Sequence, residues 1–207
     1  MYQIILASES PRRREIMETM GIEYKVITSN VEESVEETVP EEMVQAIARL
    51  KTEAVLKKQR QLEPDCQGVI ILGADTMVFY DGHALGKPKD EQDAVRMLSM
   101  LSDASHNVIT GVSIIIANKY GFEERISFAV STRVMVMPLT LEQILDYIQT
   151  GEPMDKAGAY AIQGRFGIYI KEIAGDYYNI VGFPIAKIND VLLQKGIDLK
   201  KIKIGIA

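Results

Sequence analysis

One carboxylate follows a buried apolar run in the middle of the sequence. Residues 70–72 are continuously apolar, as in a strand that is buried on both faces, and two small residues that allow close approach separate them from Asp75. We expect Asp75 at the end of this core strand, where an acid could serve as a general base or as a metal ligand. The alternative interpretation is a turn aspartate that caps its own backbone.

Two lysines bear on the chemistry of that acid. The pair Asp81-Gly82 is a hairpin turn signal, so the chain should return Lys87 close to the Asp75 end of the strand. Lys51 falls on a predicted helix over residues 40–61. Its position on that helix alone is typical of an exposed lysine with no special function.

Three consecutive arginines stand at the start of another predicted helix. Ser10 is expected to cap this helix, Pro11 occupies its first position, and Arg12, Arg13 and Arg14 follow. The helix dipole disfavours cations there, whereas the free backbone N–H groups suit an anion, so we expect a phosphate. The alternative is a solvated charge run that is paired with neighbouring acids, namely Glu9, Glu15 and Glu18.

A stretch rich in glycine and other small residues spans positions 151–164. Such residues fill a core poorly but let the backbone approach a ligand closely. Within it, Tyr160 could stack on a planar ring, and Gln163 could read one through its paired donor and acceptor groups. A glycine-rich surface loop is an equally good interpretation of the stretch alone.

Composition limits the class of protein. A chain of 207 residues with 47% hydrophobic and 25% charged residues is typical of a globular protein with one sizeable core or two small lobes. We expect a cytoplasmic protein, because no long apolar run or signal peptide is apparent. The net charge of −6 argues against broad nucleic-acid binding. The single Cys66 excludes an internal disulfide, and two distant histidines, His83 and His106, give no soft-metal site.

The pattern of apolar and turn residues predicts alternating strands and helices. Caps are expected at Asp90 and Thr140, and a long antiparallel hairpin over residues 106–117 and 122–137. The remaining strands are expected at 2–6, 23–28, 167–173 and 178–181, with a C-terminal helix over 184–195 and an edge strand from Leu199.

Seven motifs, in order along the chain, resemble those of the Maf family of nucleoside triphosphate pyrophosphatases, and the match runs from Leu6 to about Ile188. They are Ser8-Glu9-Ser10-Pro11-Arg12-Arg13, the region 48–55 around Lys51, Gly73-Ala74-Asp75-Thr76, Leu85-Gly86-Lys87-Pro88, Ile109-Thr110-Gly111-Val112, Tyr160-Ala161-Ile162-Gln163-Gly164 and Tyr178-Asn179-Ile180-Val181-Gly182-Phe183-Pro184.

The resemblance implies a single α/β (mixed α+β) domain over residues 1–207, like that of the inosine triphosphate pyrophosphatases, with two lobes around a central cleft. It also implies cleavage of the α–β phosphoanhydride to a nucleoside monophosphate and pyrophosphate. By this resemblance Asp75 is the catalytic residue. Substrate specificity falls to Arg12, Thr76 and Gln163, which look like the dTTP and UTP branch, and phosphate binding to Ser8, Arg13, Lys51 and Lys87.

A divalent cation, Mg²⁺ or Mn²⁺, is the implied cofactor, with Asp75 and Glu33 as its ligands. The segment Asn30-Val31-Glu32-Glu33 departs from the more usual Asp-Val-Asp-Glu, which leaves open which carboxylates hold the metal. We expect a homodimer, the commonest oligomer. Two alternatives remain at this point: a nucleotide-sensing regulator of cell division that does not cleave its ligand, and a house-cleaning pyrophosphatase for purine triphosphates.

Overall fold

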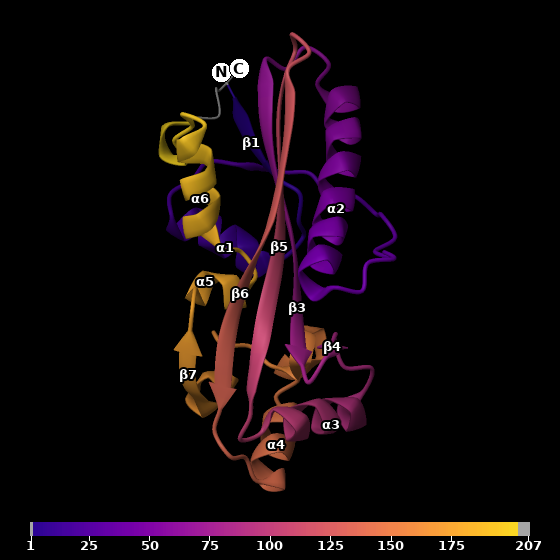
Figure 1. Cartoon of the computed structure of the whole chain (residues 1–207), viewed down its shortest axis with the longest axis vertical. Helices are drawn as coiled ribbons and strands as arrows, with labels where there is room; N and C mark the ends of the chain where they lie inside the picture. The colour runs from indigo at the N-terminus through magenta and orange to yellow at the C-terminus, as the bar shows by residue number, and fades with distance from the viewer. Residues whose placement is uncertain (1, 203–207) are drawn as a thin grey trace. The chain divides into compact units, whose positions relative to one another are not determined.

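The computed structural model describes residues 2–202 and contains one mixed sheet flanked by helices (Figure 1). The strands are β1 (Gln3–Leu6), β2 (Lys25–Val26), β3 (Gly68–Tyr80), β4 (His83–Leu85), β5 (Ser105–Asn118), β6 (Glu123–Val136) and β7 (Ile170–Ala174). The α-helices are α1 (Pro11–Thr19), α2 (Pro40–Leu62), α3 (Glu91–Leu101), α4 (Leu141–Ile148), α5 (Tyr177–Val181) and α6 (Ile185–Gln194). Short 3₁₀ turns are η1 (Glu152–Asp155), η2 (Ala157–Ala159), η3 (Arg165–Tyr169) and η4 (Leu199–Lys201).

The sheet mixes parallel and antiparallel pairs. Its strand order is β2-β1-β3-β5-β6-β7, and β4 pairs with β3 outside this path. β1 runs parallel to both β2 and β3, whereas the pairs β3–β4 and β6–β7 are antiparallel. The predicted mixed α/β fold with a long hairpin, β5 and β6, is therefore confirmed.

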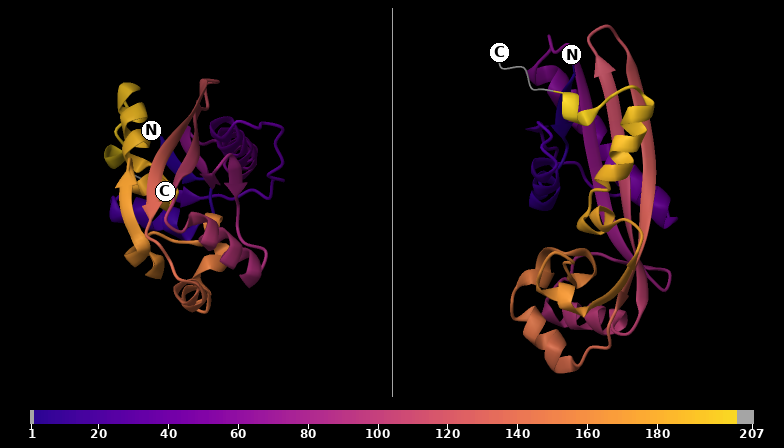
Figure 2. Two further views of the ribbon diagram at one scale, coloured as in Figure 1. Left: turned by 60° about the horizontal axis from the view of Figure 1, so that its bottom comes forward. Right: turned by 90° about the vertical axis from the view of Figure 1, so that its left-hand side faces the viewer.

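The chain divides into two compact units. Unit 1 comprises residues 1–75, 110–129 and 182–207, and unit 2 comprises residues 76–109 and 130–181. In unit 1, α2 lies on one side of the strands and α6 on the other (Figures 1 and 2). In unit 2, α3 and α4 pack against each other over an apolar core that includes Val78, Leu98 and Phe166.

Two glycines let α2 lie directly on the sheet in unit 1. A Cβ at Gly111 would overlap the backbone of Val44, and a Cβ at Gly73 would meet the Thr52 methyl group at 2.5 Å and the Ala48 carbonyl at 3.2 Å. The close approach that the small residues before Asp75 were expected to allow is therefore the approach of a helix of the same chain.

The helix caps predicted at Asp90 and Thr140 and the turn predicted at Asp81-Gly82 are present in the structure. The Asp90 side chain accepts a hydrogen bond from the Asp93 N–H (2.8 Å), and Thr140 forms a capping box with Gln143. The turn between β3 and β4 has positive φ at Asp81 (49°) and Gly82 (75°), as the hairpin signal requires. Among residues 2–202, every helix is too short or too polar to cross a lipid bilayer.

Four strand predictions were wrong or too long. Residues 178–181 lie in α5, because Asp176 caps this helix by accepting from the Tyr178 N–H (2.8 Å). Only the second half of 167–173 is strand, since η3 occupies residues 165–169. The strand predicted over 23–28 is reduced to Lys25–Val26, because its partner β1 ends at Leu6. At the C-terminus, 199–201 form a 3₁₀ turn instead of an edge strand, and 203–207 lie outside the described residues.

Two further details at the candidate site differ from the prediction. Asp75 lies inside β3, which continues to Tyr80, because the apolar and β-branched residues after Asp75 extend the strand. Ser10 precedes α1, but its side chain makes no capping hydrogen bond. Its N–H instead donates to Ser8 Oγ (3.2 Å), which also accepts from Arg13.

Candidate active site

Lys51 joins the two predicted metal ligands in unit 1. Its Nζ lies 2.8 Å from Asp75 Oδ1 and 3.0 Å from Glu33 Oε1. The side chains of Lys51 and Asp75 are only 15% and 12% exposed, whereas that of Glu33 is 53% exposed. One largely buried ammonium thus holds two carboxylates that would otherwise repel each other.

The position of Lys51 follows from the packing of α2. The neighbouring Thr52 is buried and its hydroxyl lies 2.8 Å from Ser113 Oγ on β5. Gly73 and Gly111 bring the helix down onto β3 and β5, and this contact fixes its rotation. Lys51 then extends along the surface of the sheet to Asp75. The interpretation of Lys51 as an ordinary exposed lysine is wrong.

Arg13 connects three parts of unit 1. Its Nε donates to the Gly182 carbonyl (2.8 Å) and its Nη1 donates to Ser8 Oγ (2.9 Å). Burial lowers the pKa of the Arg13 guanidinium, Asp75 and Glu33 oppose this through their negative charge, and adjacent Arg12 reinforces it. Arg13 therefore lies in the field of the carboxylates that Lys51 binds, so it is no part of a solvated charge run.

Two carboxylates on one ammonium form a donor set of the kind that a hard divalent cation accepts. Mg²⁺ is commonly held by one or two carboxylates together with substrate phosphates and water. Asp75 and Glu33 fit this pattern, because an oxygen of each lies within 3.0 Å of the same Nζ. Within residues 2–202 no group of three or more His, Cys, Asp or Glu side chains could hold a metal ion, so a cation here would depend on substrate oxygens.

The other predicted site residues belong to unit 2. Thr76 directly follows Asp75 in β3 and is partly buried, Lys87 is exposed after β4, and Gln163 is exposed in the glycine-rich segment. The structure brings together Ser8, Arg13, Lys51, Asp75 and Glu33 in unit 1, with Arg12 beside Arg13. The roles predicted for all nine of these residues stay predictions, those of Thr76, Lys87 and Gln163 included.

Tyr160 does not offer its ring to a ligand. The residue is 5% exposed, its hydroxyl lies 2.7 Å from His106 Nε2, and its ring packs on Phe166 at a centroid distance of 5.0 Å. The predicted stacking role is therefore wrong, because Tyr160 is part of the core of unit 2.

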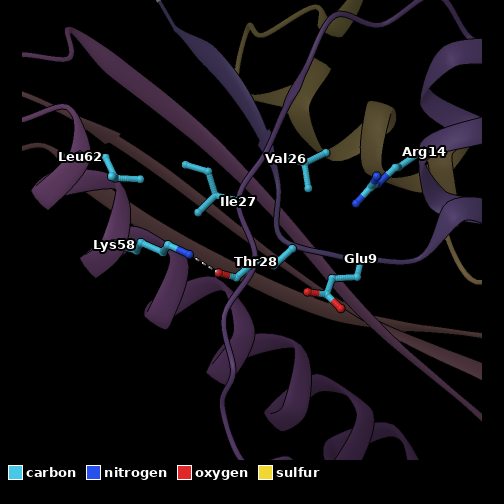
Figure 3. Close-up of a pocket in the computed structure, with 7 residues that line it drawn as sticks. All are labelled: Glu9, Arg14, Val26, Ile27, Thr28, Lys58 and Leu62. Carbon is cyan, nitrogen blue, oxygen red and sulfur yellow. Dashed lines mark hydrogen bonds between the residues drawn. The ribbon is translucent and has the colours of Figure 1, made fainter.

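A separate pocket of about 470 Å³ lies in unit 1, beside β2 (Figure 3). It is lined by Glu9, Arg14, Val26, Ile27, Thr28, Lys58 and Leu62. Lys58 crosses it to donate to the Thr28 carbonyl (3.1 Å), as the dashed line in Figure 3 marks. Arg14, from the run of three arginines, lines this pocket, but Lys51, Asp75 and Glu33 do not. The pocket is therefore a different feature from the cluster that these three residues form, which we call the Lys51 cluster.

Sequence reasoning missed the residues that support the cluster. Ser113 was a detectable signal, since it is a hydroxyl within an apolar strand, but its partner Thr52 could not be identified without the fold. The Gly182 carbonyl, a backbone acceptor for Arg13, leaves no trace in the sequence beyond the glycine itself.

Comparisons with known proteins bear on the family and the fold of this chain. The family model described as Maf-like protein matches residues 3–195. The chain is 48% identical over 202 residues to the dTTP/UTP pyrophosphatase of Lachnoclostridium phytofermentans, covering 97% of this chain and 99% of the relative. It is 45% identical over 205 residues to the dTTP/UTP pyrophosphatase of Agathobacter rectalis, covering 96% and 100%. The structure of a HAM1 protein from Coxiella burnetii has a TM-score of 0.51 at 13% identity and covers 94% of this chain and 100% of its own, which shows a shared fold.

Proposed function

Because this chain belongs to the Maf family, we propose that it is a nucleoside triphosphate pyrophosphatase that hydrolyses the α–β phosphoanhydride of dTTP and UTP. The observation that carries the proposal is the Lys51 cluster. It sets one carboxylate, Asp75, rigidly beside a buried cation, in a chain whose relatives across nearly their full length are named for this activity.

In the proposed reaction a water molecule attacks the α-phosphorus. Asp75 accepts the water proton on the carboxylate oxygen that Lys51 does not bind. The new P–O bond forms as the bridge to the β-phosphorus breaks, and the bridging electrons leave with the pyrophosphate. The products are the nucleoside monophosphate, pyrophosphate and a proton that Asp75 returns to solvent.

Cations of the chain offset the charge of the substrate, which carries close to four negative charges. We assign Arg12, Arg13, Lys51 and Lys87 to this task, because positioned cations stabilise the charge that builds up on a leaving phosphate. Ser8 holds the Arg13 guanidinium through a 2.9 Å hydrogen bond. Asp75 and Glu33 would hold a divalent cation, Mg²⁺ or Mn²⁺, which offsets phosphate charge and lowers the pKa of water that binds to it.

In this proposal Arg12, Thr76 and Gln163 determine the preference for the pyrimidines uracil and thymine. A glutamine amide can accept from the N3–H of uracil or thymine and donate to a ring carbonyl, whereas cytosine reverses part of that edge. Gln163 is exposed and its side chain makes no hydrogen bond within residues 2–202, so its amide is available for a base. A cytoplasmic location and a homodimer stay predictions. The names of the relatives favour neither a non-catalytic regulator nor a purine-specific enzyme.

The test is hydrolysis of UTP, dTTP, CTP, GTP and 7-methyl-GTP with Mg²⁺ in ¹⁸O-labelled water. We expect UTP and dTTP to yield monophosphate and pyrophosphate, with the label in the monophosphate. Release of nucleoside diphosphate and orthophosphate, or label in the pyrophosphate, would contradict attack at the α-phosphorus. CTP or GTP hydrolysed as well as UTP would contradict the specificity.

A matched pair of variants tests Asp75. Asp75→Asn should lower kcat by about 10²–10⁴ because the general base is lost. The control Asp65→Asn makes the same chemical change at an exposed turn and should leave turnover unchanged. If Asp75→Asn keeps more than a tenth of wild-type turnover, Asp75 has no part in the mechanism.

A further inference from the structure

The glutamine loop, residues 161–165, is held from both sides by one carboxylate. Glu152 Oε2 accepts the Arg165 N–H (3.1 Å), and Glu152 Oε1 accepts the Tyr147 hydroxyl (2.8 Å). The same Tyr147 oxygen accepts the Ala161 N–H (3.3 Å). The backbone two residues before Gln163 and two residues after it is therefore bound to the Tyr147–Glu152 pair.

Gly164 lets the carboxylate reach the loop. A Cβ at Gly164 would overlap both the Oε1 and the Oε2 atoms of Glu152, so any larger residue would displace the glutamate from its two partners. Glu152 itself is fixed from behind, because its N–H donates to Thr150 Oγ1 (3.2 Å), which donates to the Tyr147 carbonyl (2.6 Å).

Tyr147 is a rigid anchor for this pair. The residue is 4% exposed at the end of α4, and its ring packs on Phe166 at a centroid distance of 5.0 Å. Burial raises the pKa of its hydroxyl, and the hydrogen bond to Glu152 raises it further, so the hydroxyl stays a donor to the carboxylate at all physiological pH values.

These contacts end at the backbone, while the Gln163 side chain is exposed. If Glu152 only capped the start of η3, its hydrogen bond with the Arg165 N–H would be enough. In the structure its second carboxylate oxygen also accepts from the Tyr147 hydroxyl, and Tyr147 binds the Ala161 N–H at the other end of the loop. We propose that Glu152 and Tyr147 are positioning residues that fix Gln163 for discrimination between uracil or thymine and cytosine. The inference rests on the proposed function, and specifically on the role of Gln163 there.

The experiment measures kcat/KM for UTP and CTP in the full-length chain. Glu152→Gln replaces one acceptor oxygen with an NH₂ group that faces another donor, and Tyr147→Phe removes the bridge to Ala161. Each variant should lower the UTP-to-CTP ratio by about tenfold, since discrimination depends on buried polar groups that pair in a fixed geometry. Glu142→Gln, on the exposed side of α4, makes the same chemical change and should leave the ratio unchanged.

A double-mutant cycle separates positioning from general destabilisation. Gly164→Ala should lower the ratio in the wild-type background but change it little in Glu152→Ala, because the overlap with the carboxylate is then gone. Leu98→Val, which truncates the core of the same unit, should lower the melting temperature without moving the ratio.

The outcomes distinguish a failure of the proposed function from a failure of the positioning role of Glu152 and Tyr147. If the wild type cleaves no triphosphate, the proposed function itself fails. If Gln163→Ala leaves the ratio unchanged, Gln163 does not read the base and the positioning role falls with it. If Gln163→Ala abolishes the preference while Glu152→Gln and Tyr147→Phe keep it, the positioning role is overturned and the proposed function stands.

Discussion

Acidification should destabilise this protein through one buried histidine. His106 is 2% exposed, and burial lowers its pKa from 6.5 to about 4. The folded state therefore keeps His106 neutral while the unfolded chain takes up a proton below pH 6.5. Stability is fully present above pH 6.5 and is lost as the pH falls toward 4.

The size of the effect follows from the two pKa values. Each unit of difference corresponds to about 1.4 kcal/mol, so full titration would remove about 3 kcal/mol. Between pH 7 and pH 4.5 the linkage relation gives about 2 kcal/mol. This is a large share of the 5–15 kcal/mol or so that stabilises ordinary domains.

The assay is urea unfolding at several pH values from 7 to 4.5, followed by far-UV circular dichroism because the chain has no tryptophan. His106→Gln cannot take up the proton, so its free energy of unfolding should fall by about 2 kcal/mol less than that of the wild type over this range. His83→Gln, at the exposed start of β4, should follow the wild type. If His106→Gln and the wild type lose stability in parallel, burial of the neutral ring is not the cause.

Two further variants test the packing that places the site. Gly111→Ala would force a Cβ into the Val44 backbone, so the free energy of unfolding should fall by about 1–3 kcal/mol, and kcat/KM should fall about 100-fold because α2 carries Lys51. In the control Gly86→Ala the Cβ would meet open space, so the free energy of unfolding should change little. An equal loss of stability in both variants would contradict the packing argument. Lys51→Met should lower kcat/KM for UTP by about 10²–10³ and should also lower the free energy of unfolding. The control Lys57→Met, on the exposed face of the same helix, should change neither quantity. Wild-type kinetics in Lys51→Met would exclude Lys51 from phosphate binding.

Features that depend on neighbours in sequence were predictable. The caps at Asp90 and Thr140 bind backbone groups three residues away, so the signal and its partner fall in one short window. The turn at Asp81-Gly82 is likewise decided by the conformations that these two residues tolerate. The long hairpin followed because both of its strands are rich in residues that favour strands.

Features that depend on partners far away in the sequence could not be predicted. Residues 178–181 favour a strand by composition, but Asn179 is fully buried and donates to the Val108 carbonyl (2.9 Å) and to Thr132 Oγ1 (3.0 Å). These contacts come from strands more than 40 residues away, and they select the helix α5. Lys51 could be assigned to the site only by resemblance, because its partner Asp75 meets it through the packing of a whole helix on the sheet.

The position of Asp75 within β3 explains why one of the two carboxylates that contact Lys51 is held rigidly while the other is adjustable. Its backbone belongs to a strand, and its Lys51 partner is fixed by the buried Thr52–Ser113 contact, so the carboxylate is held by regular elements as a catalytic group should be. Glu33 contacts the same ammonium from residues 27–38, which contain no helix or strand, and its side chain is half-exposed. Only one of the two acids is therefore tied to the scaffold. In the proposed mechanism, an incoming cation and triphosphate would replace the Lys51–Glu33 contact without moving Asp75, which favours Asp75 as the base and Glu33 as an adjustable ligand.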